Sequence, residues 1–174
     1  KLGKSFEYIP APLDSKKFQD ITISVEKKNQ IVFVGRDSFE KGIDILRNIE
    51  SKINASVKYC TNMDWKDAMK ILKESQILVV PSRTESIPQV IKEAFFLQVP
   101  VIATNVGGIP ELISNNITGL LVPPENPEEL ANTINGLLSD NSTQQKLSKN
   151  GFEFINKNFS WDALMEKYIK LYES

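Results

Sequence analysis

The sequence predicts an α/β protein built on a Rossmann-like, doubly wound parallel sheet. Short apolar runs rich in β-branched residues alternate with segments whose apolar residues recur at helical spacing. Turn-forming or polar residues follow the apolar runs, which is where strands end. Strands that alternate with helices pair in parallel, and right-handed crossovers then place helices on both faces of the sheet.

Five segments are predicted to be the strands of this sheet. IVFVG (31–35), ILVV (77–80) and VPVIAT (99–104) are almost entirely apolar, as strands covered on both faces are. SVKYC (56–60) and TGLLV (118–122) complete the set.

The segments between the strands carry helix signals. Asp64 is placed to cap a helix over 64–75, and Ser160 to cap one over 160–172. Pro88 suits the first turn of a helix over 88–97. One face of the helix over 64–75 is apolar: Trp65, Ala68, Met69 and Leu72. Further helices are predicted at 39–51, 127–138 and 142–156, and 106–113 is predicted to be a glycine turn followed by a short helix that starts at Pro110.

The composition excludes several classes of function. The chain has 174 residues, 41% hydrophobic and 25% charged, which is typical of one globular domain. Its net charge of −1 gives no reason to expect a nucleic-acid partner, and no apolar run is long enough to cross a bilayer. There is no histidine, so a Ser–His–Asp triad, a Cys–His pair and a histidine zinc site are impossible within the chain. The single cysteine, Cys60, fits a reducing compartment and is expected to be a small buried hydrophobe.

Two cations follow the first predicted strand. In sheets of this type, ligands bind beyond the carboxyl ends of the strands, where the strand order reverses. Arg36 and Lys41 leave such an end in the sequence GRDSFEKG. A planar guanidinium and a compact ammonium suit a diphosphate, although the two side chains taken alone are also compatible with solvated surface cations.

Two carboxylates follow the third predicted strand, in PSRTESIPQVIKEA. Glu85 is expected in the loop and Glu93 inside the helix that Pro88 begins. Eight residues of continuous helix would separate them by about 12 Å, whereas the carboxyl pair of a retaining glycosidase lies about 5 Å apart. The wide spacing favours two anchors at opposite ends of one long ligand, with the helix N-terminus between them available to phosphates. An ordinary loop carboxylate and an exposed helix carboxylate would produce the same spacing.

The residues after this strand closely resemble the C-terminal signature of glycosyltransferase family 4. The stretch 80–113 follows the pattern P-S-x-x-E, seven residues, E-A, then P-V-I-A-T-x-x-G-G-x-P-E. VGRDSFEKGID (34–44) resembles the family's V-G-R…K-G motif, EYIPAPLDSKKF (7–18) its opening segment, and FSWDALMEKYIKLYES (159–174) its closing helix. The resemblance covers essentially the whole chain, with the motifs in the family's order.

The resemblance implies roles for the charged residues. Arg36 and Lys41 would bind the donor's diphosphate and stabilise the leaving nucleotide. Glu93 would accept hydrogen bonds from the ribose hydroxyls, and Glu85 would hold hydroxyls of the transferred sugar. Asn62 would lie beside the base, although no motif fixes which residue of 61–63 contacts it.

One departure from the family pattern affects the phosphate cradle. Many members have Gly-Phe-Gly directly after the first glutamate, whereas this chain has Ser86, Ile87 and Pro88. Because Pro88 has no N–H, one amide donor is absent, and Ser86, Ile87 and Gln89 are the candidates to supply the rest.

The glycines and the tryptophan near these motifs are expected to be structural. Gly107 and Gly108 permit a tight turn before the helix at Pro110. Trp65 is expected in the core or an interface.

The resemblance also implies an activity and its partners. The chain would be the donor-binding C-terminal domain (1–174), the C-terminal half of a GT-B fold, of a retaining hexosyltransferase that uses a UDP-sugar or GDP-sugar and neither a metal nor a cofactor. The acceptor-binding N-terminal domain would be its partner and would lie outside this sequence, which opens at Lys1 without methionine, so this piece is expected to be inactive alone. The full protein would be cytoplasmic, with peripheral association at the inner face of the membrane, and would serve polysaccharide biosynthesis.

Two other functions remain open from the sequence. A nucleotide-sugar epimerase would use similar diphosphate and ribose contacts, and a non-catalytic carbohydrate-binding module would show no affinity for UDP or GDP. A nicotinamide-dependent dehydrogenase is disfavoured because G-x-G-x-x-G does not occur.

Overall fold

The computed structural model describes residues 9–21 and 26–173 and confirms the doubly wound α/β architecture. Five parallel strands form one sheet in the order β2-β1-β3-β4-β5. The strands are β1 (Gln30–Val34), β2 (Ser56–Cys60), β3 (Ile77–Val80), β4 (Val101–Thr104) and β5 (Leu120–Val122).

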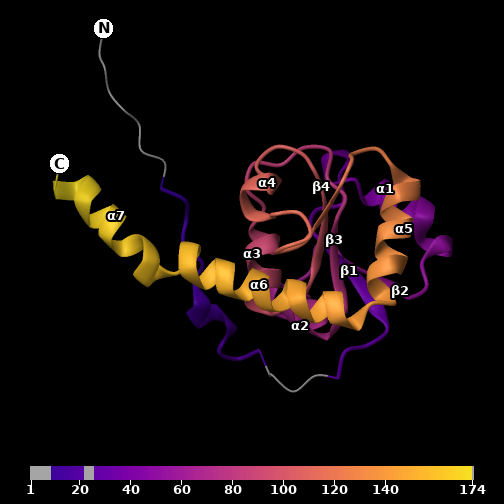
Figure 1. Ribbon diagram of the computed structural model, residues 1–174, viewed down its shortest axis with the longest axis horizontal. Coiled ribbons are helices and arrows are strands. Elements are labelled where there is room, and N and C mark those ends of the chain that lie inside the picture. The colour runs from indigo at the N-terminus through magenta and orange to yellow at the C-terminus, as the bar shows by residue number, and fades with distance from the viewer. Residues whose placement is uncertain (1–8, 22–25, 174) are drawn as a thin grey trace, which may run out of the picture.

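Helices connect these strands and cover the sheet (Figure 1). The α-helices are α1 (Ile43–Ile49), α2 (Trp65–Glu74), α3 (Gln89–Phe96), α4 (Ile109–Leu112), α5 (Pro127–Leu138), α6 (Asn141–Phe159) and α7 (Trp161–Glu173). Short 3-10 turns lie at η1 (Ser15–Phe18), η2 (Phe39–Lys41) and η3 (Glu50–Lys52).

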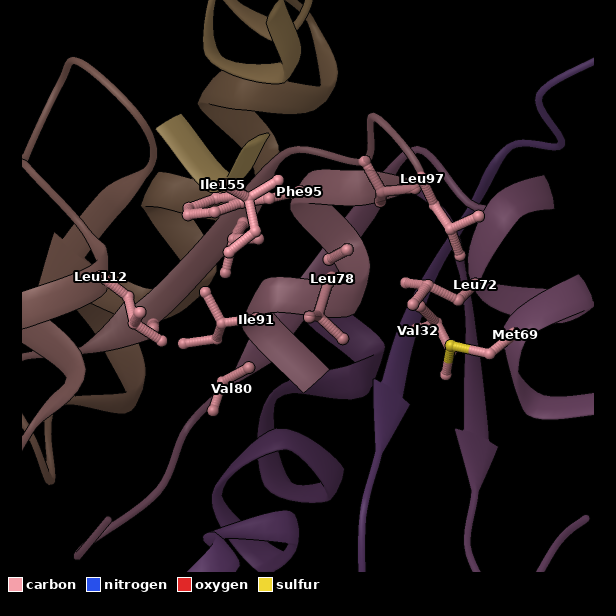
Figure 2. Close-up of a cluster of buried hydrophobic side chains, with 14 of the residues drawn as sticks. Val32, Met69, Leu72, Leu78, Val80, Ile91, Phe95, Leu97, Leu112 and Ile155 are labelled. Carbon is pink, nitrogen blue, oxygen red and sulfur yellow. The ribbon is translucent and has the colours of Figure 1, made fainter. Parts of the chain in front are cut away.

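The core has two halves because successive strand residues face opposite sides of the sheet. Val32 and Leu78 face a half that α2, α3, α4 and α6 complete, and Figure 2 shows Val32 beside Leu72 and Met69, with Leu78 between them and Ile91. Ile31 faces the other half, which α1 and α5 cover. Both faces are therefore buried, which explains why the central strands are continuously apolar.

The predicted caps are present. The Asp64 carboxylate accepts from the backbone N–H of Lys66, and the Ser160 hydroxyl accepts from that of Ala163. No helix in the described part of the chain is both long and apolar enough to cross a membrane.

Most helix boundaries differ from the sequence prediction by a residue or more, and three differences stand out. The helix predicted over 39–51 is interrupted at Gly42, whose φ of 64° ends η2 before α1 begins. Pro88 caps α3 instead of starting it, with a ψ of 121°. The helix predicted over 142–156 extends to Phe159. In the terminal segments that carry the resemblance, Glu7, Tyr8 and Ser174 lie outside the described residues.

Candidate functional site

The strand order reverses between β1 and β3. The chain runs from β1 outward to β2, and then returns to place β3 on the other side of β1. The loops at 35–42 and 81–88 therefore leave adjacent carboxyl ends and diverge there, which is the position at which open α/β sheets bind ligands.

Lys41 and Glu85 meet across this switch point. The Lys41 Nζ lies 2.6 Å from Oε1 of Glu85, and the Ser82 hydroxyl donates to the same oxygen at 3.0 Å. The Glu85 side chain is 8% exposed and that of Lys41 is 24% exposed. The sequence placed both residues at one site, and the structure brings them into direct contact.

Glycines allow the loops to approach this closely. A Cβ atom at Gly107 would lie 1.8 Å from the carbonyl oxygen of Glu85, and one at Gly108 would lie 1.8 Å from that of Ser86. The Gly108 N–H also donates to the Glu85 carbonyl at 3.2 Å. The expected architectural role of the two glycines is confirmed, because no other residue fits against the backbone of the Glu85 loop.

Arg83 fastens three loops together, and the sequence reasoning did not identify it. Its guanidinium forms a two-pronged ion pair with Asp44 at 2.7 and 2.8 Å, and it also pairs with Glu125. It donates to the Phe39 carbonyl at 2.6 Å and lies 3.8 Å from the centre of the Phe39 ring. Its backbone N–H donates to the Glu40 carbonyl. The loops after β1, β3 and β5 are thereby held in a fixed relation around the Lys41–Glu85 pair.

Glu93 lies in the second turn of α3, beside a cleft of about 590 Å³. Its Oε1 accepts a hydrogen bond from the indole N–H of Trp65 at 2.8 Å. Burial raises the pKa of the Glu93 carboxyl, and the Trp65 hydrogen bond opposes that rise. Gln89 lines the same cleft, together with Phe18 and Lys17.

Trp65 was expected to be a core or interface residue; it packs against the core and is half-buried, and it also lines this cleft. Its partner in the hydrogen bond is 28 residues away in the sequence, so no local pattern could reveal the contact.

The other predicted site residues lie around these two centres. Arg36 and Asn62 are exposed at the ends of β1 and β2, and the Arg36 guanidinium makes no hydrogen bond or ion pair with residues 9–21 or 26–173. Ser86 and Ile87 line a second hollow of about 360 Å³ with Gly108 and Glu111.

The predicted residues thus form three groups along the carboxyl edge of the sheet. Lys41 and Glu85 are paired, Glu93 and Gln89 share the larger cleft, and Ser86 and Ile87 share the second hollow. Arg36, Asn62, Lys41 and Glu85 line neither of these two hollows.

The architecture is that of the GT-B glycosyltransferases. Sucrose-phosphate synthase from Thermosynechococcus elongatus superposes with a TM-score of 0.76 at 25% identity, over 94% of this chain and 49% of that one. HepE from Anabaena, solved in complex with UDP, superposes with a TM-score of 0.77 at 19% identity, over 91% of this chain and 52% of that one.

The chain belongs to the family of glycosyl transferases group 1, whose model matches residues 45–154. The uncharacterized glycosyltransferase MJ1178 of Methanocaldococcus jannaschii is 30% identical over 166 residues, which cover 82% of this chain and 47% of that protein. The chain therefore spans about half the length of this relative and of both solved structures.

Proposed function

We propose that this chain is the donor-binding C-terminal half of a retaining family 4 glycosyltransferase, which transfers a hexose from a UDP-sugar or GDP-sugar to an acceptor hydroxyl. Membership of the group 1 transferases supports the reaction class. The single observation that carries the proposed site is the contact of Lys41 with Glu85 at the point where the strand order reverses. In this proposal Lys41 binds phosphate, and Glu85 beside it binds sugar hydroxyls.

The proposed chemistry needs stabilisation of negative charge on the leaving nucleotide. As the bond from the sugar to the β-phosphate breaks, charge develops on the diphosphate, and fixed cations lower the energy of that state. Lys41 is held at the switch point, and the exposed Arg36 guanidinium is available from the same strand end. In this proposal the two side chains act without a metal ion.

The start of α3 supplies further donors for the phosphates. Pro88, the cap residue, has no N–H, so the first amides available are those of Gln89 and Val90. The first amides of a helix have no partner inside it and carry the positive end of the helix dipole. Pro88, which stands where the family pattern has a glycine, therefore removes one amide donor, but the amides at the start of α3 remain.

Glu93 is proposed to bind the ribose. A carboxylate accepts hydrogen bonds from both hydroxyls of a ribose, and Glu93 lies beside the larger cleft, one helical turn beyond Gln89. The loop at Asn62 follows β2 and is proposed to contact the base.

Calorimetric titration of the chain with UDP, GDP and ADP tests the donor site. We expect one nucleotide to bind, and Lys41→Ala and Arg36→Ala each to weaken that binding by about tenfold, since one charge-assisted hydrogen bond contributes about 1.5–3 kcal/mol. Lys58→Ala is the matched control, because Lys58 is exposed on β2 away from both loops. Added salt should weaken binding by the wild type more than binding by Lys41→Ala.

Equal binding by Lys41→Ala, Arg36→Ala and the wild type would show that the site is misplaced. Absence of binding by the wild type to all three nucleotides would instead favour a non-catalytic module. Addition of EDTA should leave binding unchanged if the site works without metal.

The complete reaction is proposed to need the rest of the protein. The chain covers about half the length of its relative MJ1178. Family 4 members bind the acceptor on the domain that lies outside the matched half. We therefore expect the 174-residue chain to bind a sugar nucleotide without transferring the sugar at ordinary enzyme rates. A product assay on the full-length protein separates a transferase, which joins sugar to acceptor, from an epimerase, which changes the sugar on the nucleotide.

A further inference from the structure

The indole of Trp65 is fixed against the fold in the first turn of α2. Its ring meets the ring of Phe18 edge-on, with centroids 5.1 Å apart and planes at 71°. Phe18 in turn packs on Phe96, with centroids 4.7 Å apart. An aromatic ring held in this way has little rotational freedom, so the direction of its N–H is fixed before any ligand arrives.

That N–H makes the one side-chain hydrogen bond that Glu93 accepts from the described residues. It occupies Oε1 at 2.8 Å, while Oε2 accepts none from residues 9–21 or 26–173. An indole nitrogen only donates, so it has no means of competing with Glu93 for a hydroxyl proton.

Two of the cations near Glu93 are paired with other groups. The Lys92 Nζ donates to the Ala11 carbonyl at 3.1 Å, and the Lys66 Nζ pairs with Asp20 at 2.9 Å. Lys17 and Lys92 act on Glu93 only through their charge. Glu93 is therefore half-buried and held by a neutral donor, and within the described part of the chain its second oxygen accepts no hydrogen bond.

We propose that Trp65 is a positioning residue for nucleotide recognition, which fixes one oxygen of Glu93 so that the other receives the ribose hydroxyls of a nucleoside diphosphate. This inference rests on the function proposed above. It adds a specificity determinant from α2 that lies outside the sequence motifs around α3.

The first test examines the contact without any ligand. The chain has two tryptophans, Trp65 and Trp161, so an amide NMR spectrum should contain two indole N–H signals. The signal that disappears in Trp161→Phe belongs to Trp161, and the other belongs to Trp65. On lowering the pH, the Trp65 signal should move as Glu93 takes up a proton, and Glu93→Gln should abolish that part of the movement. Other charged side chains line the same cleft: Asp14, Lys16, Lys17, Asp20 and Lys66. The Glu93→Gln comparison separates their effect from that of Glu93.

The second test examines recognition of the ribose. We expect the wild type to bind its preferred nucleoside diphosphate roughly tenfold more tightly than the 2′-deoxy analogue, the effect of one hydrogen bond to a charged group. Trp65→Phe keeps an aromatic ring and removes the N–H, so this preference should fall to about twofold. In the Glu93→Gln background the same substitution should change the preference no further, because the two residues act as one unit.

The outcomes distinguish the two proposals. A wild type that binds none of UDP, GDP and ADP overturns the proposed function, while the NMR test of the contact still stands. A wild type that binds, with the 2′-hydroxyl preference unchanged in Trp65→Phe, overturns the inference alone. If Trp65→Phe does not fold, an indole signal that is insensitive to Glu93→Gln overturns the inference, and a signal that responds supports it.

Discussion

The ammonium of Lys41 lies 2.6 Å from Oε1 of Glu85, so the candidate site neutralises its own charges when it is empty. An incoming diphosphate competes with Glu85 for Lys41 and is repelled by the carboxylate. Phosphate therefore binds more weakly than it would to an unpaired Lys41, but the ion pair holds both side chains in place.

Glu85→Gln should strengthen the binding of a nucleoside diphosphate that carries no sugar. The amide keeps the shape of the side chain. It removes the negative charge that repels phosphate and that forms the ion pair with Lys41. We expect a gain of a few-fold in affinity by calorimetry, corresponding to about 1 kcal/mol. Glu166→Gln is the control, because Glu166 is exposed on α7 and lines neither hollow. Weaker binding by Glu85→Gln would contradict the proposed competition.

Gly108→Ala and Gly136→Ala should have opposite effects on stability. The methyl group at 108 would overlap the Ser86 carbonyl oxygen, whereas a Cβ at 136 in α5 meets nothing within 4 Å. We expect the first change to destabilise the chain by about 2 kcal/mol or more, as other backbone overlaps do. The second should stabilise it by about 0.5–1 kcal/mol, because glycine is unfavourable inside a helix. Urea unfolding measures both, and similar values for the two variants would disprove the close approach.

Arg83→Lys should lower the free energy of unfolding more than Arg47→Lys does, although each substitution removes a guanidinium that is paired with an aspartate. The Arg83 side chain is 14% exposed and joins three loops, whereas the Arg47 and Asp37 side chains are 47% and 45% exposed. We expect about 2 kcal/mol for Arg83→Lys from lost charged hydrogen bonds and less than about 1 kcal/mol for the surface pair. Nucleotide binding should weaken only in Arg83→Lys, because the loop bearing Lys41 loses its anchor. Denaturant unfolding and calorimetry on both variants check this.

Glu93→Gln should stabilise the chain at neutral pH. Burial raises the pKa of Glu93 in the folded state, so the folded chain holds this proton more tightly than the unfolded chain does. Stability from this group is therefore fully present below the ordinary glutamate pKa, and is lost as the pH rises through the raised value. The melting temperature of Glu93→Gln should exceed that of the wild type at pH 7, and the difference should shrink as the pH falls from 7 towards the ordinary glutamate pKa and be smallest below about 4.5. A difference that grows at low pH would contradict the assigned sign.

The sequence predicts the elements well because their signals are local. The bounds of β2, β3 and α5 match their predicted ranges, and the caps at Asp64 and Ser160 are confirmed. Cys60 is buried as expected, and burial raises the pKa of its thiol. The interruption at Gly42 was not predicted: its φ is 64°, and a Cβ there would lie 2.0 Å from the carbonyl oxygen of Pro81, a residue far along the chain.

The residues of the candidate site can be predicted from the sequence only where they belong to a motif. Lys41 and Glu85 belong to sequence motifs, and their contact follows once β1 and β3 are neighbours. Arg83 bonds to Asp44, 39 residues away, and Trp65 bonds to Glu93, 28 residues away. Such contacts depend on the tertiary fold, and the local pattern of residues does not reveal them.

The glycine pair at 107 and 108 also restricts how this protein can diverge. Because the carbonyls of Glu85 and Ser86 occupy the space of two absent methyl groups, the loop backbone is a rigid template that tolerates little remodelling. A new ligand preference must then arise through side chains mounted on that template, and those at Ser86, Ile87 and Glu111 face the second hollow. A directed-evolution library at these three positions would keep the scaffold intact while it varies the surface offered to the ligand.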